Sequence, residues 1–204
     1  MPSLIGSLSV YKHQFDRVMK KVEEGATLYV SADNLIFCEP LEKFAGLCVE
    51  NRAKPIGNET VTINGKVLPL VSQYHTIYSE AGGEVLLRDN TGNPVMSCAK
   101  HGKGKVYFVS CPIEDVAASR PHTISGEKEI CYEEFYKLIP EMRSAEKKII
   151  GDNPYVGVTE YVEEKGRRAM LVNYRPTPQT VTLKYTGIDF NEVIGEAETS
   201  DGFT

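Results

Sequence analysis

Residues 11–31 read YKHQFDRVMKKVEEGATLYVS, and this stretch decides the fold class. Its first part, Tyr11–Glu24, carries apolar side chains on a stripe with the 3.6-residue period of a helix. Gly25 follows at the position where helices commonly end in a left-handed residue. The next residues, Ala26–Ser31, form a short apolar run that is typical of a buried strand. A helix, one glycine and a buried strand in succession predict an α/β fold.

Downstream of this unit the pattern changes to short strands joined by turns. Asn64-Gly65 separates two apolar runs, Thr60–Ile63 and Lys66–Val71, and supplies the two positive-φ residues of a type I′ hairpin. Pro69 indicates that the second of these strands lies at a sheet edge. Further strands are predicted at His75–Tyr78, Glu84–Arg88, Pro94–Cys98 and Lys105–Ser110. A surface loop is expected at Ala117–Gly126, and helices at Leu41–Leu47 and Lys128–Ser144, the latter kinked or ended by Pro140.

The breaker-rich tetrapeptide Gly151–Pro154 marks the expected domain boundary. Beyond it the pattern predicts only strands, at Tyr155–Val162, Arg167–Tyr174 and Gln179–Tyr185. We therefore expect an α/β domain over residues 1–150 and a small all-β domain over residues 151–204. A segment of about 50 residues is small for an independent core, so the second domain either packs on the first or is truncated.

Composition argues against several classes of function. A net charge of −5 without a basic stripe argues against nucleic-acid binding. No stretch approaches the run of about 20 apolar residues that a membrane-spanning helix needs, and the first ten residues lack the pattern of a signal peptide. The five cysteines are widely spaced without a C-x-x-C pair, which favours buried thiols and a cytoplasmic location.

Three motifs, in order along the chain, resemble one family. Val22–Ser31 resembles V-x-x-G-G-T-L-x-x-S of the amidotransferase-like domain in β-galactosidase-like glycoside hydrolases, also called the trimerisation domain. The stretches Gly92–Val95 and Gly102–Val109 resemble G-x-P-x and G-x-G-x-V-x-Y near the end of that domain. Leu171–Tyr174 (LVNY) resembles V-x-N-Y of the small C-terminal β-domain of the same enzymes.

The resemblance implies a fold and a context. The fold would be an incomplete flavodoxin-like or class I glutamine amidotransferase-like domain, with its first strands missing before Pro2-Ser3, followed by a small antiparallel β-sandwich-like domain. The chain would be the C-terminal part of a longer glycosidase. Its partner would be the upstream (β/α)₈ barrel of the same polypeptide, which carries the two catalytic carboxylates, with assembly into homo-oligomers as a further expectation.

The residues themselves do not form a complete catalytic constellation. Cys111, Glu114 and His122 come close together in sequence, but Pro112 follows the cysteine and no glycine elbow flanks it. Cys38 and Cys48 also lack a Gly-x-Cys-x-Gly setting, so inert packing is expected for the cysteines. Acids such as Glu39, Glu42, Glu114 and Asp115 are available for a glycosidase pair, but no Trp platform or array of βα units accompanies them.

Other polar motifs are interpreted as structural. The four histidines, expected in exposed or loop positions, lack metal-ligand spacing, and Asn58–Thr60 is a glycosylation sequon by pattern only. Asp89–Asn93 is interpreted as a turn rather than a Ca²⁺ loop, and Gly102-Lys103-Gly104 as a hairpin turn rather than an anion cradle. No catalytic, cofactor-binding or metal-binding residue is therefore assigned, and no cofactor is expected. The four histidines mentioned at the start of this paragraph are His13, His75, His101 and His122.

Three functions follow as hypotheses. The first is a non-catalytic accessory and oligomerisation region of a glycoside hydrolase. The second is a carbohydrate-binding module, in which exposed tyrosines of the terminal β-region would form the platform: Tyr155, Tyr161, Tyr174 and Tyr185. The third is a free-standing hydrolase that uses Cys111 or the acids, which would need a deep pocket joining Cys111 to His122.

Overall fold

A computed structural model describes most of the chain, and all structural statements below concern these residues: 3–5, 11–31, 40–54, 57–72, 75–114, 133–143, 149–153, 155–163 and 166–185. The predicted loop Ala117–Gly126 lies outside them, as do Cys38, Glu39, Asp115, His122 and Cys131. The described residues divide into two compact units, one between residues 3 and 143 and one between 149 and 185. None of the described helices has the length and apolar character that a membrane span requires.

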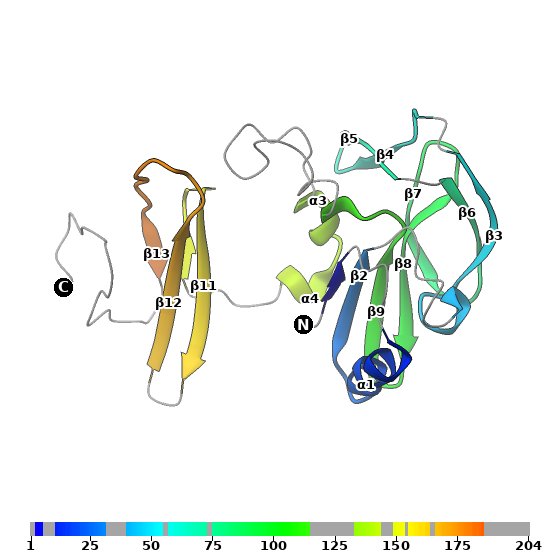
Figure 1. Ribbon diagram of the computed structural model, residues 1–204, viewed down its shortest axis with the longest axis horizontal. Helices are drawn as coiled ribbons and strands as arrows, with labels where there is room; N and C mark the ends of the chain where they lie inside the picture. The colour runs from blue at the N-terminus through cyan, green and yellow to red at the C-terminus, as the bar shows by residue number, and fades with distance from the viewer. Residues whose placement is uncertain are drawn as a thin grey trace. The chain divides into compact units, whose positions relative to one another are not determined.

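The first unit is built on a five-stranded mixed sheet (Figure 1). In spatial order its strands are β1 (Ser3–Ile5), β2 (Thr27–Ser31), β9 (Gly104–Val109), β8 (Pro94–His101) and β7 (Glu84–Arg88). The β1–β2 and β2–β9 pairs are parallel, whereas the β9–β8 and β8–β7 pairs are antiparallel. The strands predicted around residues 84–110 are confirmed.

Helix α1 (Lys12–Glu23) connects the parallel strands β1 and β2 and lies against the sheet in Figure 1. It ends as predicted, with Gly25 at φ +123°. The turn between β8 and β9 packs on this end of the helix, where Lys103 N donates to Glu23 O at 3.0 Å. Gly104 lies so close that a Cβ would meet the carbonyl oxygens of Ala26 and Val22 at 2.1 and 2.2 Å. The glycines of this turn therefore permit a close backbone approach.

Successive side chains of β2 and β9 point to opposite faces of the sheet and belong to two separate apolar clusters. One cluster combines Leu28, Val30, Val106 and Phe108 with residues of α1 and of the segment 41–47. The other combines Tyr29, Tyr107 and Val109 with the β4–β5 hairpin and the helical segment 133–143. Both faces of the central strands are thus buried, which explains their continuous apolar sequences.

The Asn64-Gly65 hairpin is confirmed. It joins β4 (Thr60–Ile63) to β5 (Lys66–Pro69), with φ of 52° at Asn64 and 77° at Gly65. Among the described strands β5 pairs only with β4, which places Pro69 at an edge as expected.

The predicted helix Leu41–Leu47 is wrong. Only Leu41–Lys43 forms a single 3₁₀ turn, η1, and Leu47 already begins β3 (Leu47–Ala53). Gly46 ends the turn with φ +66°, a conformation that a continuing helix cannot contain. Strand β3 pairs with β6 (His75–Glu80) in a separate antiparallel pair.

The predicted helix Lys128–Ser144 is, where described, two short helices. These are α3 (Glu133–Tyr136) and α4 (Pro140–Arg143). Pro140 begins the second helix because a proline at the first helical position loses no hydrogen bond.

The second unit contains two antiparallel pairs. Strand β10 (Ile149–Gly151) pairs with β13 (Leu183–Tyr185), and β11 (Val156–Glu163) pairs with β12 (Gly166–Asn173). The strand expected at Gln179–Tyr185 is shorter than predicted. The domain limits 1–150 and 151–204 stay a prediction, and β10 includes residues on both sides of that limit.

Most elements of the described chain are strands, with few helices and small sheets. The finer assignment to an amidotransferase-like α/β class remains a prediction.

Candidate functional site

The carboxyl ends of parallel strands are the edge at which open α/β sheets bind ligands. In this chain that edge is formed by Ser31, the last residue of β2, and by the segment that follows β9. Glu114 in this segment accepts hydrogen bonds from the hydroxyls of Tyr29 at 2.7 Å and Tyr136 at 2.6 Å, and from the Ser31 hydroxyl. Side chains of the protein itself therefore occupy both oxygens of the carboxylate.

The two tyrosines of this cluster are held as neutral donors. Burial raises the pKa of both Tyr29 and Tyr136, and the adjacent Glu114 carboxylate raises it further. A phenol with a raised pKa cannot serve as a base near neutral pH. The Glu114 cluster thus fastens the end of β2 to the segment after β9 and to α3.

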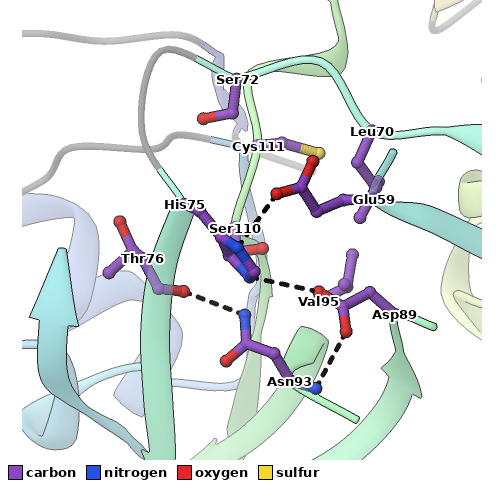
Figure 2. Close-up of a pocket in the computed structure, with 10 residues that line it drawn as sticks. All are labelled: Glu59, Leu70, Ser72, His75, Thr76, Asp89, Asn93, Val95, Ser110 and Cys111. Carbon is purple, nitrogen blue, oxygen red and sulfur yellow. Dashed lines mark hydrogen bonds and ion pairs between the residues drawn. The ribbon is translucent and has the colours of Figure 1, made fainter. Parts of the chain in front are cut away.

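A second cluster surrounds a buried histidine (Figure 2). His75, the first residue of β6, lies between two carboxylates. Its Nδ1 is 3.0 Å from Glu59 Oε1, and its Nε2 is 3.5 Å from Asp89 Oδ2. All three side chains are at most 10% exposed. Histidines were expected in exposed or loop positions, and for His75 that expectation is wrong.

The turn after β7 supplies the second carboxylate of this cluster. Asp89 Oδ1 accepts hydrogen bonds from Thr91 N and Oγ1 and from Asn93 N, so its carboxylate organises the turn as predicted. Asn93 in turn bonds to β6, donating to Thr76 O at 2.9 Å and accepting from Tyr78 N at 2.9 Å. This network fixes the turn against β6.

The cavity beside His75 is small. It is lined by polar side chains such as Ser72 and Thr76, together with Cys111, and its volume is about 30 Å³. That volume is close to the share of a single water molecule, whereas small-molecule sites begin at about 300 Å³. The cluster is therefore a buried polar connection within the fold and has no room for a sugar or peptide substrate.

The cysteine predicted as a possible nucleophile is buried. Cys111 is 2% exposed and packs in the second apolar cluster beside Val109 and Ile113. The nitrogens of His75, which lines the same cavity, face the carboxylates of Glu59 and Asp89. A Cys/His pair needs the base directed at the sulfur and a substrate within reach of both, and this arrangement provides neither.

The remaining described cysteines and histidines serve other contacts. Cys48 and Cys98 are half-buried free thiols, and burial raises the pKa of each. His13 stacks on Tyr11, and His101 Nε2 lies 2.8 Å from Phe44 O. Within the part of the chain that the structure describes, no three His, Cys, Asp or Glu side chains are grouped to hold a metal ion.

An open groove of about 730 Å³ runs past the first unit's sheet. Its lining includes Glu42, Glu84, Lys105, Tyr107 and Leu138. Lys105 Nζ and Tyr107 OH both donate to Glu141, at 2.9 and 2.8 Å. Glu42 lines this groove but Glu114 does not, so the structure does not bring these two candidate acids into one pocket.

Comparisons with solved structures link the fold to a group of enzymes. No protein-family model matches the chain, and no curated protein matches its sequence. A β-galactosidase from Bacillus circulans sp. alkalophilus is similar over 84% of this chain and 27% of its own, with a TM-score of 0.59 and 15% identity. A catalytic mutant of Gan42B, a GH42 β-galactosidase from G. stearothermophilus, is similar over 81% and 25%, with a TM-score of 0.57 and 15% identity.

A cold-adapted β-galactosidase from Rahnella sp. R3 is similar over 84% of this chain and 27% of its own, with a TM-score of 0.54 and 17% identity. The chain thus spans about a quarter of the length of these enzymes. At such identities the similarity describes the fold: most of this chain is folded like a part of GH42-type β-galactosidases.

Proposed function

We propose that this chain is a non-catalytic accessory region of a glycoside hydrolase, and that a catalytic (β/α)₈ barrel lies upstream of it. The observation that carries the proposal is the pattern of coverage. The fold similarity includes 81–84% of this chain but only about a quarter of each β-galactosidase. The three sequence motifs support a position in the C-terminal part of such enzymes.

The fold of the first unit supports an amidotransferase-like origin for this region. Strands β1, β2 and β9 are parallel, and α1 provides the crossover between β1 and β2. Parallel strands with a helical crossover are the repeating unit of flavodoxin-like folds. The Cys111 environment supports a domain that has the architecture of an amidotransferase without its chemistry.

The polar sites also favour a structural role. The strand-end edge is filled by the Glu114 cluster, and the cavity beside His75 has room for about one water molecule. A retaining or inverting glycosidase needs two carboxylates about 5–10 Å apart in a sugar-binding cleft. Glu42 and Glu114, the described acids considered for such a pair, do not share the open groove.

The proposal is tested by two measurements on the purified chain. Hydrolysis of p-nitrophenyl β-glycosides should be absent in the chain alone and should appear when the upstream region of its gene is co-expressed. Light scattering should show an assembly larger than a monomer for the chain alone or together with that region. Turnover by the chain alone that disappears in Glu114→Gln or in Cys111→Ser would overturn the proposal in favour of a free-standing hydrolase.

A further inference from the structure

One face of the β11–β12 hairpin gathers three tyrosines. The register pairs Val156 with Asn173 and Tyr161 with Arg168, and Tyr174 N donates to Tyr155 O at 2.9 Å. Because alternate residues of a strand share a face and opposed residues share it too, one face carries ten residue positions. We call it the tyrosine face, and its positions are Tyr155, Gly157, Thr159, Tyr161, Glu163, Gly166, Arg168, Met170, Val172 and Tyr174.

The tyrosine face is the open side of the hairpin. Tyr161 and Tyr174 are each 47% exposed, Met170 is 46% exposed and Val172 is 36% exposed. The opposite face is engaged within the second unit, where Val156 is buried and Glu160 accepts hydrogen bonds from Arg167 and from Ile149 N of β10. Leu171 on the opposite face is also 42% exposed, but both exposed tyrosine rings belong to the tyrosine face, and contiguous exposed apolar side chains mark a binding surface.

Gly157 determines how one of these rings lies. A Cβ at Gly157 would come within 2.4 Å of the Tyr174 hydroxyl and within 2.9 Å of two of its ring carbons. The Tyr174 ring therefore lies across the glycine, on the sheet surface, with its other side directed outward. At the same end the Arg175 guanidinium lies 3.7 Å from the Tyr155 ring centroid and covers that ring. Tyr174 and Tyr161 are thus the rings available for stacking.

The length and width of the tyrosine face indicate which kind of ligand fits it. Six residue steps along β11 span about 20 Å and the two strands are about 5 Å apart, so the face is a narrow strip. A stable protein interface takes about 800 Å² of accessible surface on one side and would have to extend beyond a face of two strands. A linear oligosaccharide has the matching shape, and its sugar rings present C–H faces that stack on aromatic rings.

We propose that the tyrosine face binds an uncharged, extended oligosaccharide chain, with one sugar on the outward side of Tyr174 and another on Tyr161. Thr159 and Arg168 provide polar groups on the same face for sugar hydroxyls. Two of its ten positions carry charged residues, Glu163 and Arg168, and their charges are opposite in sign. This inference rests on the second unit alone and does not depend on the accessory role proposed above.

Isothermal titration of the full chain with cellohexaose and mannohexaose, which are β-1,4-linked and extended, tests the proposal. Tyr174→Ala and Tyr161→Ala should each weaken binding by about tenfold, as expected for the loss of one stacked ring. Gly157→Ala should weaken it similarly, because the added methyl displaces the Tyr174 ring although neither tyrosine is replaced. Maltohexaose, whose α-linkages make it curl, should bind more weakly than the extended chains.

Two control variants match these changes. Leu171→Ala removes an apolar side chain that is 42% exposed on the opposite face of β12, and Tyr11→Ala removes a tyrosine that is 72% exposed in the other unit. Both should bind within about twofold of the unaltered chain, and thermal unfolding should show that all variants are folded. The proposal is overturned if neither β-linked probe binds at millimolar concentration, or if Leu171→Ala weakens binding as much as Tyr174→Ala. It is also overturned if Tyr161→Ala converts a dimer to a monomer, since the face would then bind a second copy.

Discussion

Nδ1 of His75, at the start of β6, lies 3.0 Å from the carboxylate of Glu59, which precedes β4. The contact joins two strand pairs that share no ladder, because β6 pairs with β3 and β4 pairs with β5. Asp89, in the turn after β7, lies close to the other ring nitrogen. His75 and these two carboxylates form the junction between the segments. The imidazole is therefore a connection between three segments of the first unit.

Replacing His75 should destabilise this unit. His75→Ala leaves the buried carboxylates of Glu59 and Asp89 without the imidazole, and breaking a buried polar pair costs about 3 kcal/mol of unfolding free energy. Urea unfolding followed by circular dichroism would measure the loss. His13→Ala, which alters an exposed ring on α1, is the matched control and should change the free energy by less than about 0.5 kcal/mol. Equal effects of the two substitutions would contradict a structural role for the junction.

Glu134 should make stability depend on acid pH. Hydrogen bonds from Lys137, Lys66 and Asn64 lower the pKa of this carboxyl from 4.5 to about 2. Because the folded-state pKa lies below the unfolded one, ionised Glu134 stabilises the fold above pH 4.5, and this contribution is lost as the pH falls from 4.5 toward 2.

Urea unfolding at pH 7, 4, 3 and 2 would check this expectation. Glu134→Gln should reduce stability at pH 7 and flatten the decline below pH 4.5, whereas Glu24→Gln, at an exposed pair with Lys21, should keep the shape of the curve. A decline that Glu134→Gln leaves unchanged would show that other carboxyls cause it.

Gly104 should tolerate no side chain. In Gly104→Ala the new methyl would meet the backbone oxygens of Ala26 and Val22, so the β8–β9 turn must move away from α1. We expect a loss of about 3 kcal/mol in unfolding free energy, within the range for overpacked sites. Gly166→Ala is the control, because nothing lies within 4 Å of its added Cβ. Thermal unfolding of both variants would compare them, and a Gly104→Ala protein as stable as the control would be inconsistent with the close approach.

Glu114 should stabilise the fold where strands β2 and β9 end. Glu114→Gln replaces a carboxylate that accepts three hydroxyl bonds by a neutral amide, which we expect to cost about 2 kcal/mol. The variant should also ionise Tyr29 and Tyr136 at lower pH, because the carboxylate contributes to their raised pKa. Tyrosinate absorbance during an alkaline titration would report this change, and an unaltered titration would argue against the contact.

The local patterns were sufficient to predict several elements. The stripe of Tyr11–Glu24 and the Asn64-Gly65 turn depend on neighbours in sequence, so helix α1 and the β4–β5 hairpin are found where periodicity and turn chemistry put them. Strand β3 was missed because the polar residues Glu50, Asn51 and Arg52 interrupt its apolar run and its pairing with β6 is a long-range contact. Strand β10 was missed because Gly151 was interpreted as a breaker.

The polar clusters could not be predicted from sequence. Glu59, His75 and Asp89 belong to three segments, and no spacing rule links residues that tertiary packing alone brings together. Asp89 gave a signal only for its turn, which the structure confirms. Cys111, in contrast, carried a usable signal: an apolar strand before it and a proline after it indicated a packed thiol.

The hydrogen bonds that Tyr29, Ser31 and Tyr136 donate to Glu114 mean that an outside ligand would have to compete with this side chain. At the carboxyl ends of the parallel strands, where α/β sheets bind ligands, this chain supplies a carboxylate from its own Glu114 side chain, a few residues beyond β9. A tethered group has an effective concentration in the millimolar range or above. A free carboxylate present at a concentration below this value would not displace Glu114. The hydroxyl donors at this edge are therefore already occupied when the protein has folded.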